Sequence, residues 1–130
     1  MRFAAAVLAI VAFIPGLVAQ EGHPLRGTWH GSWGTNDKDR VSVTLVMDWD
    51  GSKVTGTLNP GLHSSPIEKT SLDPAGWHFQ FETNYKDRAG KTEHATVDAK
   101  IVDVTNARRQ LVGTWTQGGK TGDFKVVRDN

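Results

Sequence analysis

The sequence predicts an all-β fold, most simply an eight-stranded antiparallel up-and-down barrel, with a two-sheet β-sandwich as the alternative. Short segments that alternate apolar and polar residues cover most of the chain after residue 20. Turn-forming Asp, Asn, Pro and Gly separate these segments. No stretch after residue 20 has a 3.6-residue apolar period long enough for a helix. Successive hairpins favour a barrel, because closure removes exposed sheet edges.

Eight segments carry the alternation, and we expect each of them to form a strand. They are residues 25–33, 41–49, 53–58, 64–72, 77–82, 91–104, 109–116 and 123–128.

The first two segments have the clearest alternation. In 25–33, Gly and Trp residues recur at every second position after Leu25, so they share one face of a strand. In 41–49, every second residue from Val41 to Trp49 is apolar and most residues between them are polar. Both segments are therefore expected to bury one face.

The next two segments are defined by the turns around them. Asp50-Gly51 predicts a hairpin turn, because Gly accepts the positive φ that such turns require. The segment 53–58 returns from that turn, and Asn59-Pro60-Gly61 ends it. The alternation in 64–72 is weaker, and Ile67 is its main apolar anchor.

The last four segments repeat the same pattern. In 77–82 aromatic residues alternate with polar ones, and in 91–104 small and β-branched residues alternate with polar and charged ones. The segments 109–116 and 123–128 follow, separated by the turn at Gln117-Gly118-Gly119. Inward-facing aromatic residues are expected to fill much of the interior, so we expect a shallow aromatic mouth and no deep lipid pocket. They are Trp29, Trp49, Trp77, Phe79, Phe81 and Trp115.

Residues 1–19 are predicted to be a secretory signal peptide, which leaves residues 20–130 as a single β-barrel domain. Arg2 supplies the positive charge, 3–14 is an unbroken apolar run, and a small residue, Ala19, precedes the expected cleavage site. The run is shorter than the ~20 residues of a membrane-spanning helix, so we expect no membrane span in the mature chain. The Ala-rich signal, the absence of cysteine and the absence of N-glycosylation sequons indicate a bacterial protein, periplasmic or extracellular.

The charge and the cysteine count exclude several classes of protein. The chain has 130 residues, with 15 Lys and Arg against 14 Asp and Glu, and this near-neutral balance argues against a nucleic-acid partner. The absence of cysteine excludes a disulfide scaffold, a thiolate metal site and a Cys nucleophile.

No motif of catalysis or metal binding is found. No pair among the five His residues has the compact spacing of a zinc motif. The acid pair Asp48 and Asp50 is assigned to a wet strand face and a turn, and no Ser has the context of a nucleophile elbow. We therefore expect no catalytic residue, no metal and no cofactor, and a protein that is not an enzyme.

Several short motifs resemble the calycin pattern of lipocalins, fatty-acid-binding proteins and avidins. Gly27-Thr28-Trp29 on the first strand matches the opening Gly-x-Trp, and Arg128 matches the late Arg that lies over this Trp in lipocalins. The resemblance implies a lipocalin-like or avidin-like barrel, and we assign its structural closure to Gly27, Trp29, Trp115 and Arg128. The second and third lipocalin motifs are missing, as are the lipocalin disulfide and a biotin-binding set. The resemblance therefore carries no ligand.

The chain is more closely similar to a group of small exported bacterial domains of unknown function. The matching motifs are Gly27-Thr28-Trp29-His30-Gly31, Asp50-Gly51, Val54-Thr55-Gly56-Thr57, Gly113-Thr114-Trp115, Gly122-Asp123-Phe124 and Arg128. These motifs are short, and they span nearly all of the mature chain. This similarity implies the barrel fold and export.

The expected function is that of an exported, non-enzymatic, lipocalin-like domain that binds a small or extended ligand at the barrel mouth. The candidate ligand-binding residues are Trp33, Trp77, His30 and His78. Trp33 ends a strand beside a polar loop, so we expect it to be the most exposed of the five Trp residues. The alternative is a solid barrel that acts as a structural or protein-interaction module of the cell envelope. The partner is accordingly an unknown small ligand or an envelope protein.

Overall fold

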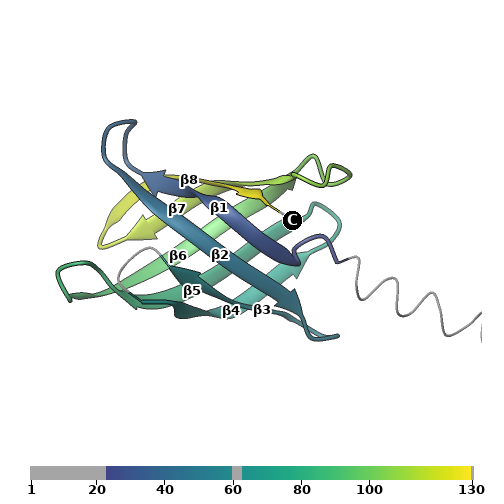
Figure 1. Cartoon of the computed structure of the whole chain (residues 1–130), viewed down its shortest axis with the longest axis horizontal. Helices are drawn as coiled ribbons and strands as arrows, with labels where there is room; N and C mark the ends of the chain where they lie inside the picture. The colour runs from purple at the N-terminus through teal and green to yellow at the C-terminus, as the bar shows by residue number, and fades with distance from the viewer. Residues whose placement is uncertain (1–22, 60–62, 130) are drawn as a thin grey trace, which may run out of the picture.

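The computed structural model describes residues 23–59 and 63–129, which form a closed antiparallel β-barrel (Figure 1). Each strand pairs with the next one along the chain, and β8 pairs with β1. This confirms the predicted all-β, eight-stranded up-and-down barrel and rules out the sandwich. The strands are β1 (Gly27–Gly34), β2 (Arg40–Trp49), β3 (Val54–Asn59), β4 (Ser65–Asp73), β5 (His78–Lys86), β6 (Thr92–Val102), β7 (Gln110–Gln117) and β8 (Lys120–Arg128). The predicted signal peptide, 1–19, lies outside the described residues.

Two strands are longer than predicted. β5 continues to Lys86, because Thr83 and Tyr85 keep the inward alternation. Thr83 is buried although it is polar, and its Oγ1 donates a hydrogen bond of 3.0 Å to the carbonyl of Pro66. β8 begins at Lys120, because the turn between β7 and β8 is tight and both of its glycines have positive φ (56° and 78°).

Side chains fill the barrel interior, as predicted. The largest fully buried ones include Trp29, Trp115, Phe79, Phe81 and Phe124. Trp49 and Trp77, also predicted to point inward, are half-buried and pack against this core from one end of the barrel. The packed interior leaves no room for a ligand deep within the described part of the barrel.

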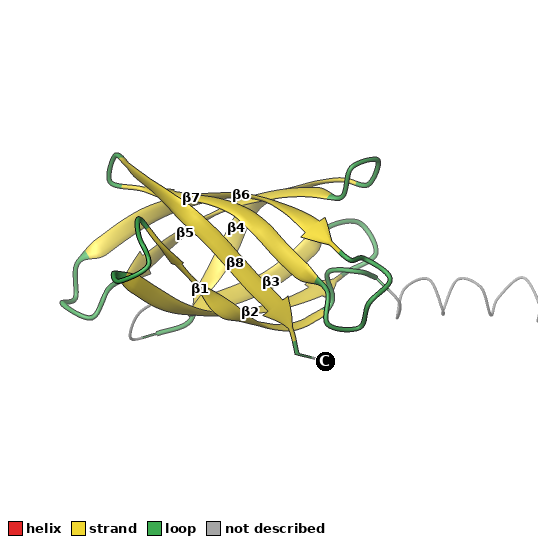
Figure 2. Cartoon of the chain, turned by 90° about the horizontal axis from the view of Figure 1, so that it is seen from above, coloured by secondary structure: helices red, strands yellow, loops and turns green. Residues whose placement is uncertain are grey.

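The two ends differ in construction. At the end that we call the mouth, the connections 35–39, 87–91 and 118–119 join the strands. At the opposite end, called here the closed end, lie the N-terminal segment 23–26, the connections 50–53, 74–77 and 103–109, and the last described residue (Figure 2). Within the described ranges, no helix is long and apolar enough to cross a membrane.

Hydrogen bonds to main-chain carbonyls hold the closed end together. The Trp29 indole is fully buried and its Nε1 donates to the carbonyl of Leu25 at 2.9 Å. Arg128 lies opposite Trp29 in the pairing of β1 with β8. Its guanidinium donates to the carbonyls of Arg26 at 2.8 Å and Ala107 at 3.1 Å. Arg128 therefore ties β8 to the N-terminal segment and to the connection between β6 and β7.

The structure corrects one part of the predicted closure group. Trp115 lies near the mouth end of β7, close to the turn that follows Gln117, and not beside Trp29. Its ring stacks on that of Trp33, which is at the mouth end of β1. The other three residues of the group, Gly27, Trp29 and Arg128, lie together at the closed end.

The contact between β3 and β4 is the weakest seam of the barrel. Only two residue pairs join these strands, Thr57 with Pro66 and Leu58 with Ser65. β4 is then displaced by a register shift between Glu68 and Ser71 in its pairing with β5. Nearer the closed end these two strands no longer pair through their main chains. There Thr70 Oγ1 of β4 donates a hydrogen bond of 2.9 Å to the carbonyl of Val54 in β3.

Candidate ligand-binding site

A cavity of about 530 Å³ opens at the mouth of the barrel. This volume falls within the range of small-molecule sites in proteins. Buried and half-buried side chains line its depth, namely Trp33, Arg40, Val41, Tyr85, Asp87 and Gln117. Exposed residues form its edge, namely Ser42, Arg88 and Ala89. The cavity therefore combines apolar walls with a few polar groups.

Stacked aromatic rings support the cavity from below. The rings of Trp33 and Trp115 are parallel within 7°, with centroids 5.0 Å apart. The Tyr85 ring meets the Trp115 ring edge to face, with centroids 6.2 Å apart, and the Phe124 ring is tilted against it, with centroids 5.9 Å apart. Such offset and edge-on contacts fix the rings relative to one another. The floor is thus preformed.

Trp33 is less exposed than predicted. Only 8% of its surface is accessible, so it is not the most exposed Trp of the described chain. The reason is the stack with Trp115, which comes from a strand far away in the sequence. Trp33 nevertheless lines the mouth cavity, as the binding prediction requires.

Gln117 presents its amide nitrogen as a free donor. Its Oε1 accepts a hydrogen bond of 2.9 Å from Trp115 Nε1 and one of 2.7 Å from the Tyr85 hydroxyl. An indole N–H can only donate, so the amide must turn its oxygen toward Trp115. Burial raises the pKa of Tyr85, against the effect of the bond to Gln117, so the phenol stays protonated and donates. Within the described residues the Gln117 NH₂ group makes no hydrogen bond.

The indole nitrogen of Trp33 is a second free donor. It is buried and has no hydrogen-bond partner among the described residues. Burying a donor without an acceptor costs about 1–3 kcal/mol, so native proteins leave few such groups. Because the nitrogen itself is buried, only an acceptor that displaces neighbouring side chains would reach it.

Two arginines bring positive charge to the cavity. Arg40 is held in a bidentate pair with Asp123, at 2.6 Å and 2.9 Å, and its Nη2 also donates to Ser32 Oγ at 3.1 Å. Arg88 is exposed at the edge and forms no ion pair within the part of the chain that is described. The carboxylate of Asp87 accepts the main-chain N–H groups of Ala89 and Lys91, at 3.0 Å and 2.9 Å. Donor groups therefore outnumber acceptors in this cavity.

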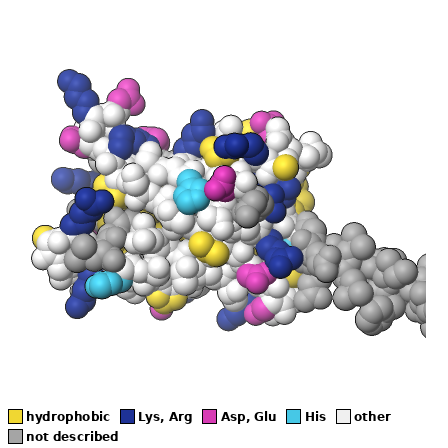
Figure 3. Space-filling view, in the orientation of Figure 1, with side chains coloured by type: hydrophobic (Ala, Val, Ile, Leu, Met, Phe, Trp, Pro, Cys, Tyr) yellow, Lys and Arg dark blue, Asp and Glu magenta, His cyan; other side chains and the backbone are white. Residues whose placement is uncertain are grey.

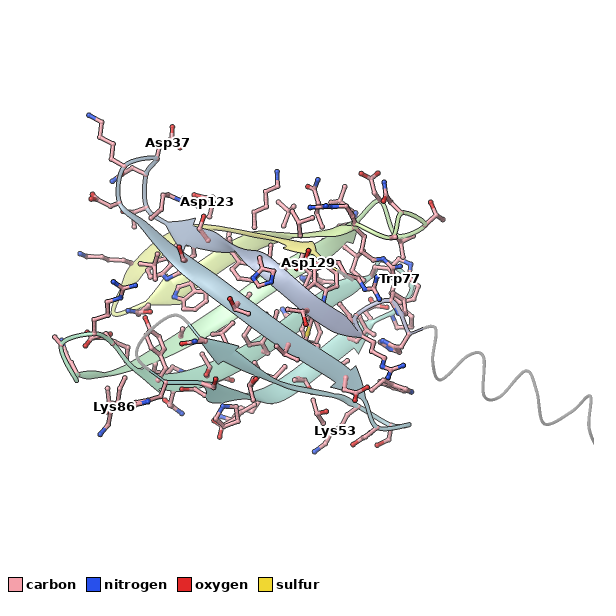
Figure 4. All side chains as sticks on the ribbon, in the orientation of Figure 1. Asp37, Lys53, Trp77, Lys86, Asp123 and Asp129 are labelled. Carbon is pink, nitrogen blue, oxygen red and sulfur yellow. The ribbon has the colours of Figure 1, made fainter. Side chains whose placement is uncertain are left out.

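The four predicted binding residues do not form one site. Trp33 lines the mouth, but Trp77 is at the closed end, where it lines a different and smaller cavity (Figure 4). His30 and His78 lie on the outer surface of the barrel, because they alternate with inward-facing neighbours. Of the four, only Trp33 belongs to the mouth cavity.

The two histidines contact carboxylates on the outer surface instead. His30 Nε2 is 3.3 Å from the carboxylate of Asp129. His78 pairs with Asp98, which also accepts a hydrogen bond of 3.0 Å from Gln80. Desolvation raises the pKa of Asp98, but the hydrogen bonds from His78 and Gln80 outweigh it, so this pKa lies below its ordinary value. These contacts stabilise the outer face of the barrel and form no pocket.

Arg40, Tyr85 and Gln117 were not predicted from the sequence as site residues. The predicted fifth strand ended at residue 82, so Tyr85 was outside it, and Gln117 was assigned to a turn. The predicted topology contained one signal that could have found them. In an up-and-down barrel, the ends of the odd-numbered strands and the starts of the even-numbered strands meet at one end of the barrel. That rule places all three residues at the same end as Trp33.

Comparisons with protein-family models, with curated proteins and with solved structures found no match for this chain. In the described ranges, no three side chains of His, Asp, Glu or Cys come close enough together to hold a metal ion.

Proposed function

We propose that this chain is an exported, non-enzymatic, lipocalin-like barrel that binds a small molecule in the mouth cavity. The observation that carries the proposal is the free amide nitrogen of Gln117 at that cavity, beside a rigid aromatic floor made by Trp33 and Trp115. A ligand with a flat ring and acceptor oxygens matches these groups. Arg88 at the edge favours a ligand with a negative charge.

The closed end supports the lipocalin-like part of this proposal. The Gly-x-Trp motif places Trp29 at the closed end, and Arg128 lies on the strand beside it. In contrast to a lipid-binding barrel, the interior here is filled by Trp, Phe and Leu side chains. The ligand is therefore small and sits at the mouth, not within the barrel.

Native mass spectrometry of the protein purified gently from its producing cells tests the proposal. We expect an added mass that denaturation releases. We expect Arg88→Ala to reduce the occupancy and Arg108→Ala, an exposed arginine at the closed end, to leave it unchanged. A bare protein mass, with no binding to a panel of small carboxylates, phenols and sugars, would overturn it.

The second candidate function is the solid interaction module, which the filled interior favours. On the face shown in Figure 3, acidic and basic side chains are interspersed and hydrophobic ones form small separate areas. A native mass spectrum that shows the protein without any added ligand would favour this second function.

Export has its own test. When the full chain is produced in a bacterial host, the intact mass of the product is expected to correspond to a chain that starts at Gln20. A product that retains residues 1–19 would contradict the proposed export.

A further inference from the structure

The closed end carries a second cavity, separate from the mouth. Its volume is about 290 Å³, at the lower limit for small-molecule sites. It lies where the end of β2 and the start of β3 face the end of β4 and the start of β5. Most of its wall is apolar, built from Trp49, Val54, Leu72, Trp77 and Phe79.

Two tryptophans stand at this cavity in fixed positions. The Trp49 ring stacks on the His23 ring, with centroids 4.4 Å apart and planes within 13°. His23 Nδ1 accepts the main-chain N–H of Leu25 at 3.2 Å, which requires the neutral ring. Burial lowers the pKa of His23 and so favours that neutral form. His23 therefore adds a flat uncharged surface to the wall.

Trp77 is held at the cavity against a backbone preference. Its φ is +51°, in the left-handed region where bulky residues are rare. Its carbonyl accepts the N–H of Ile101 at 3.0 Å, which pins this conformation. Residues held in such strained conformations cluster at ligand sites. A glycine at this position would form the turn without strain. The indole at the cavity is what the Trp provides and a Gly would not.

Lys53 is the residue that brings charge to this cavity. It lines the wall and forms no ion pair within the described ranges. The nearby carboxylate of Asp50 is engaged in its own turn: its Oδ1 accepts from Ser52 N at 2.8 Å, Ser52 Oγ at 3.0 Å and Lys53 N at 2.8 Å. Figure 4 shows Lys53 and Trp77 at the same end of the barrel.

We propose that the closed-end cavity is a second binding site, which takes a small amphiphilic acid. The apolar ring or short chain of this acid packs against Trp49 and Trp77, and its carboxylate pairs with Lys53. Both Trp side chains are half-buried, so a ligand can reach them. This site differs from the mouth, where the groups without partners are mainly hydrogen-bond donors.

The test is an NMR titration of the whole protein with 4-phenylbutyrate, read on the indole N–H signals of the five Trp residues. Trp49→Phe and Trp77→Phe assign the two signals of interest. We expect saturable shifts of the Trp49 and Trp77 signals and none of the Trp33 signal. Because Trp33 lines the mouth, the two sites are read separately, and failure of one does not affect the other.

Charge recognition is tested with a variant and a neutral analogue. We expect Lys53→Gln to weaken 4-phenylbutyrate binding about fivefold, as for an exposed ion pair. Lys120→Gln, at the mouth end of β8, is the matched control and is expected to have no effect. The neutral 4-phenylbutanamide is expected to bind the unaltered protein and Lys53→Gln equally weakly.

Three results would overturn the proposal. The first is the absence of saturable shifts at millimolar probe, and the second is a shift of the Trp33 signal in place of Trp49 and Trp77. The third is equal binding of the acid and the amide. Trp77→Gly removes the indole and also relieves the backbone strain, so it tests the wall without leaving a strained main chain. Unchanged binding to this variant contradicts the role of Trp77.

Discussion

Gly113 shows how close neighbouring backbones come inside this barrel. A Cβ atom at this position would lie 2.0 Å from the carbonyl oxygen of Asp98 and 2.6 Å from the Cα of Ala99. Both are main-chain atoms of β6, so no side-chain rotation can make room. The position therefore requires glycine because of space and not because of φ.

We expect Gly113→Ala to lower the free energy of unfolding by about 3 kcal/mol, since overpacking a tight core forces the backbone to shift. Gly76→Ala is the matched control, because a Cβ at Gly76 meets no atom within 4 Å. That variant is expected to stay within about 0.5 kcal/mol of the unaltered protein. Urea denaturation of both variants measures the difference, and equal stabilities would refute the close approach.

At the scale of single residues, the sequence predicted which way a side chain points better than how deeply it is buried. In the alternating segments 25–33 and 77–82, His30 and His78 stand between the residues of the apolar face, and the structure has both on the outside. The burial of Trp33 was not predictable in this way. It depends on the ring of Trp115, and a single-strand pattern contains no information on which ring lies across the barrel.

At the scale of strands, the Arg40–Asp123 pair fastens β2 to β8 across the end of β1. The two side chains make two parallel hydrogen bonds, and Arg40 also reaches Ser32 of β1. The hydrogen bond from Arg40 holds the pKa of Asp123 below its ordinary value. The Asp123 carboxylate therefore takes up a proton less readily in the folded protein than in the unfolded chain.

The pair is expected to make stability depend on pH in the acid range. Its contribution is complete above the ordinary Asp pKa of about 3.9 and is lost as the pH falls through the lower pKa of the folded state. We expect Asp123→Asn to lower the Tm by about 3 °C at pH 7, a modest effect because the carboxylate is exposed.

This Tm difference should shrink as the pH is lowered below about 4, because the unaltered protein then loses the same ion pair. Asp37→Asn, in the connection that precedes β2, serves as the control. Its carboxylate acts on Arg40 only through space, so this change is expected to lower the Tm at pH 7 less than Asp123→Asn does. A Tm difference that stays constant from pH 7 to pH 2 would contradict the assignment.

Arg128 of β8 links the N-terminal segment to the connection between β6 and β7 at the closed end. Arg128→Ala removes the hydrogen bonds to the carbonyls of Arg26 and Ala107. We expect a loss of about 2 kcal/mol in the free energy of unfolding, as for hydrogen bonds from a charged group. Arg108→Ala, at an exposed position of the same connection, is expected to have almost no effect. Equal stability of both variants, measured by urea denaturation, would show that Arg128 does not close this end.

Strand positions were predicted well, and their ends less so. The turns at Asp50-Gly51 and Gly118-Gly119 follow from glycine chemistry, and both have the expected positive φ. The extension of β5 was missed because Thr83 is polar, and the acceptor that satisfies it, the carbonyl of Pro66, belongs to β4. The mouth was predicted as the binding site, with Trp33 in it, but Tyr85 and Gln117 were missed, since they meet only after the barrel closes.

At the scale of the whole molecule, the barrel is not equally strong all the way round. Eight residue pairs join β6 to β7, but only two join β3 to β4. One of those two pairs includes Pro66, which has no N–H to donate. The order and closure of the strands followed from successive hairpins. The short β3–β4 pairing, and the register shift between β4 and β5 near Lys69, are irregularities that no periodicity predicts.

We expect hydrogen exchange to reveal the seam. The amides of β3 and β4 should exchange faster than those of β6 and β7, because they open without unfolding the rest of the barrel. Residue-resolved exchange measured by NMR tests this, with β5 as an internal reference, since it pairs with β4 on one side and β6 on the other. Uniform protection around the barrel would contradict a weak seam.

The seam also indicates where this polypeptide can be divided. Both described chain ends lie together at the closed end, where the N–H of Asp129 donates to the carbonyl of Thr28 at 2.7 Å. A piece carrying β1 to β3 and a piece carrying β4 to β8 would keep six of the eight strand contacts within themselves. Their reassembly would form the other two, the two-pair junction of β3 with β4 and the six-pair junction of β8 with β1. The β3–β4 connection is therefore the natural site for a split reporter or a circular permutant, whose reassembly would signal the closing of the barrel.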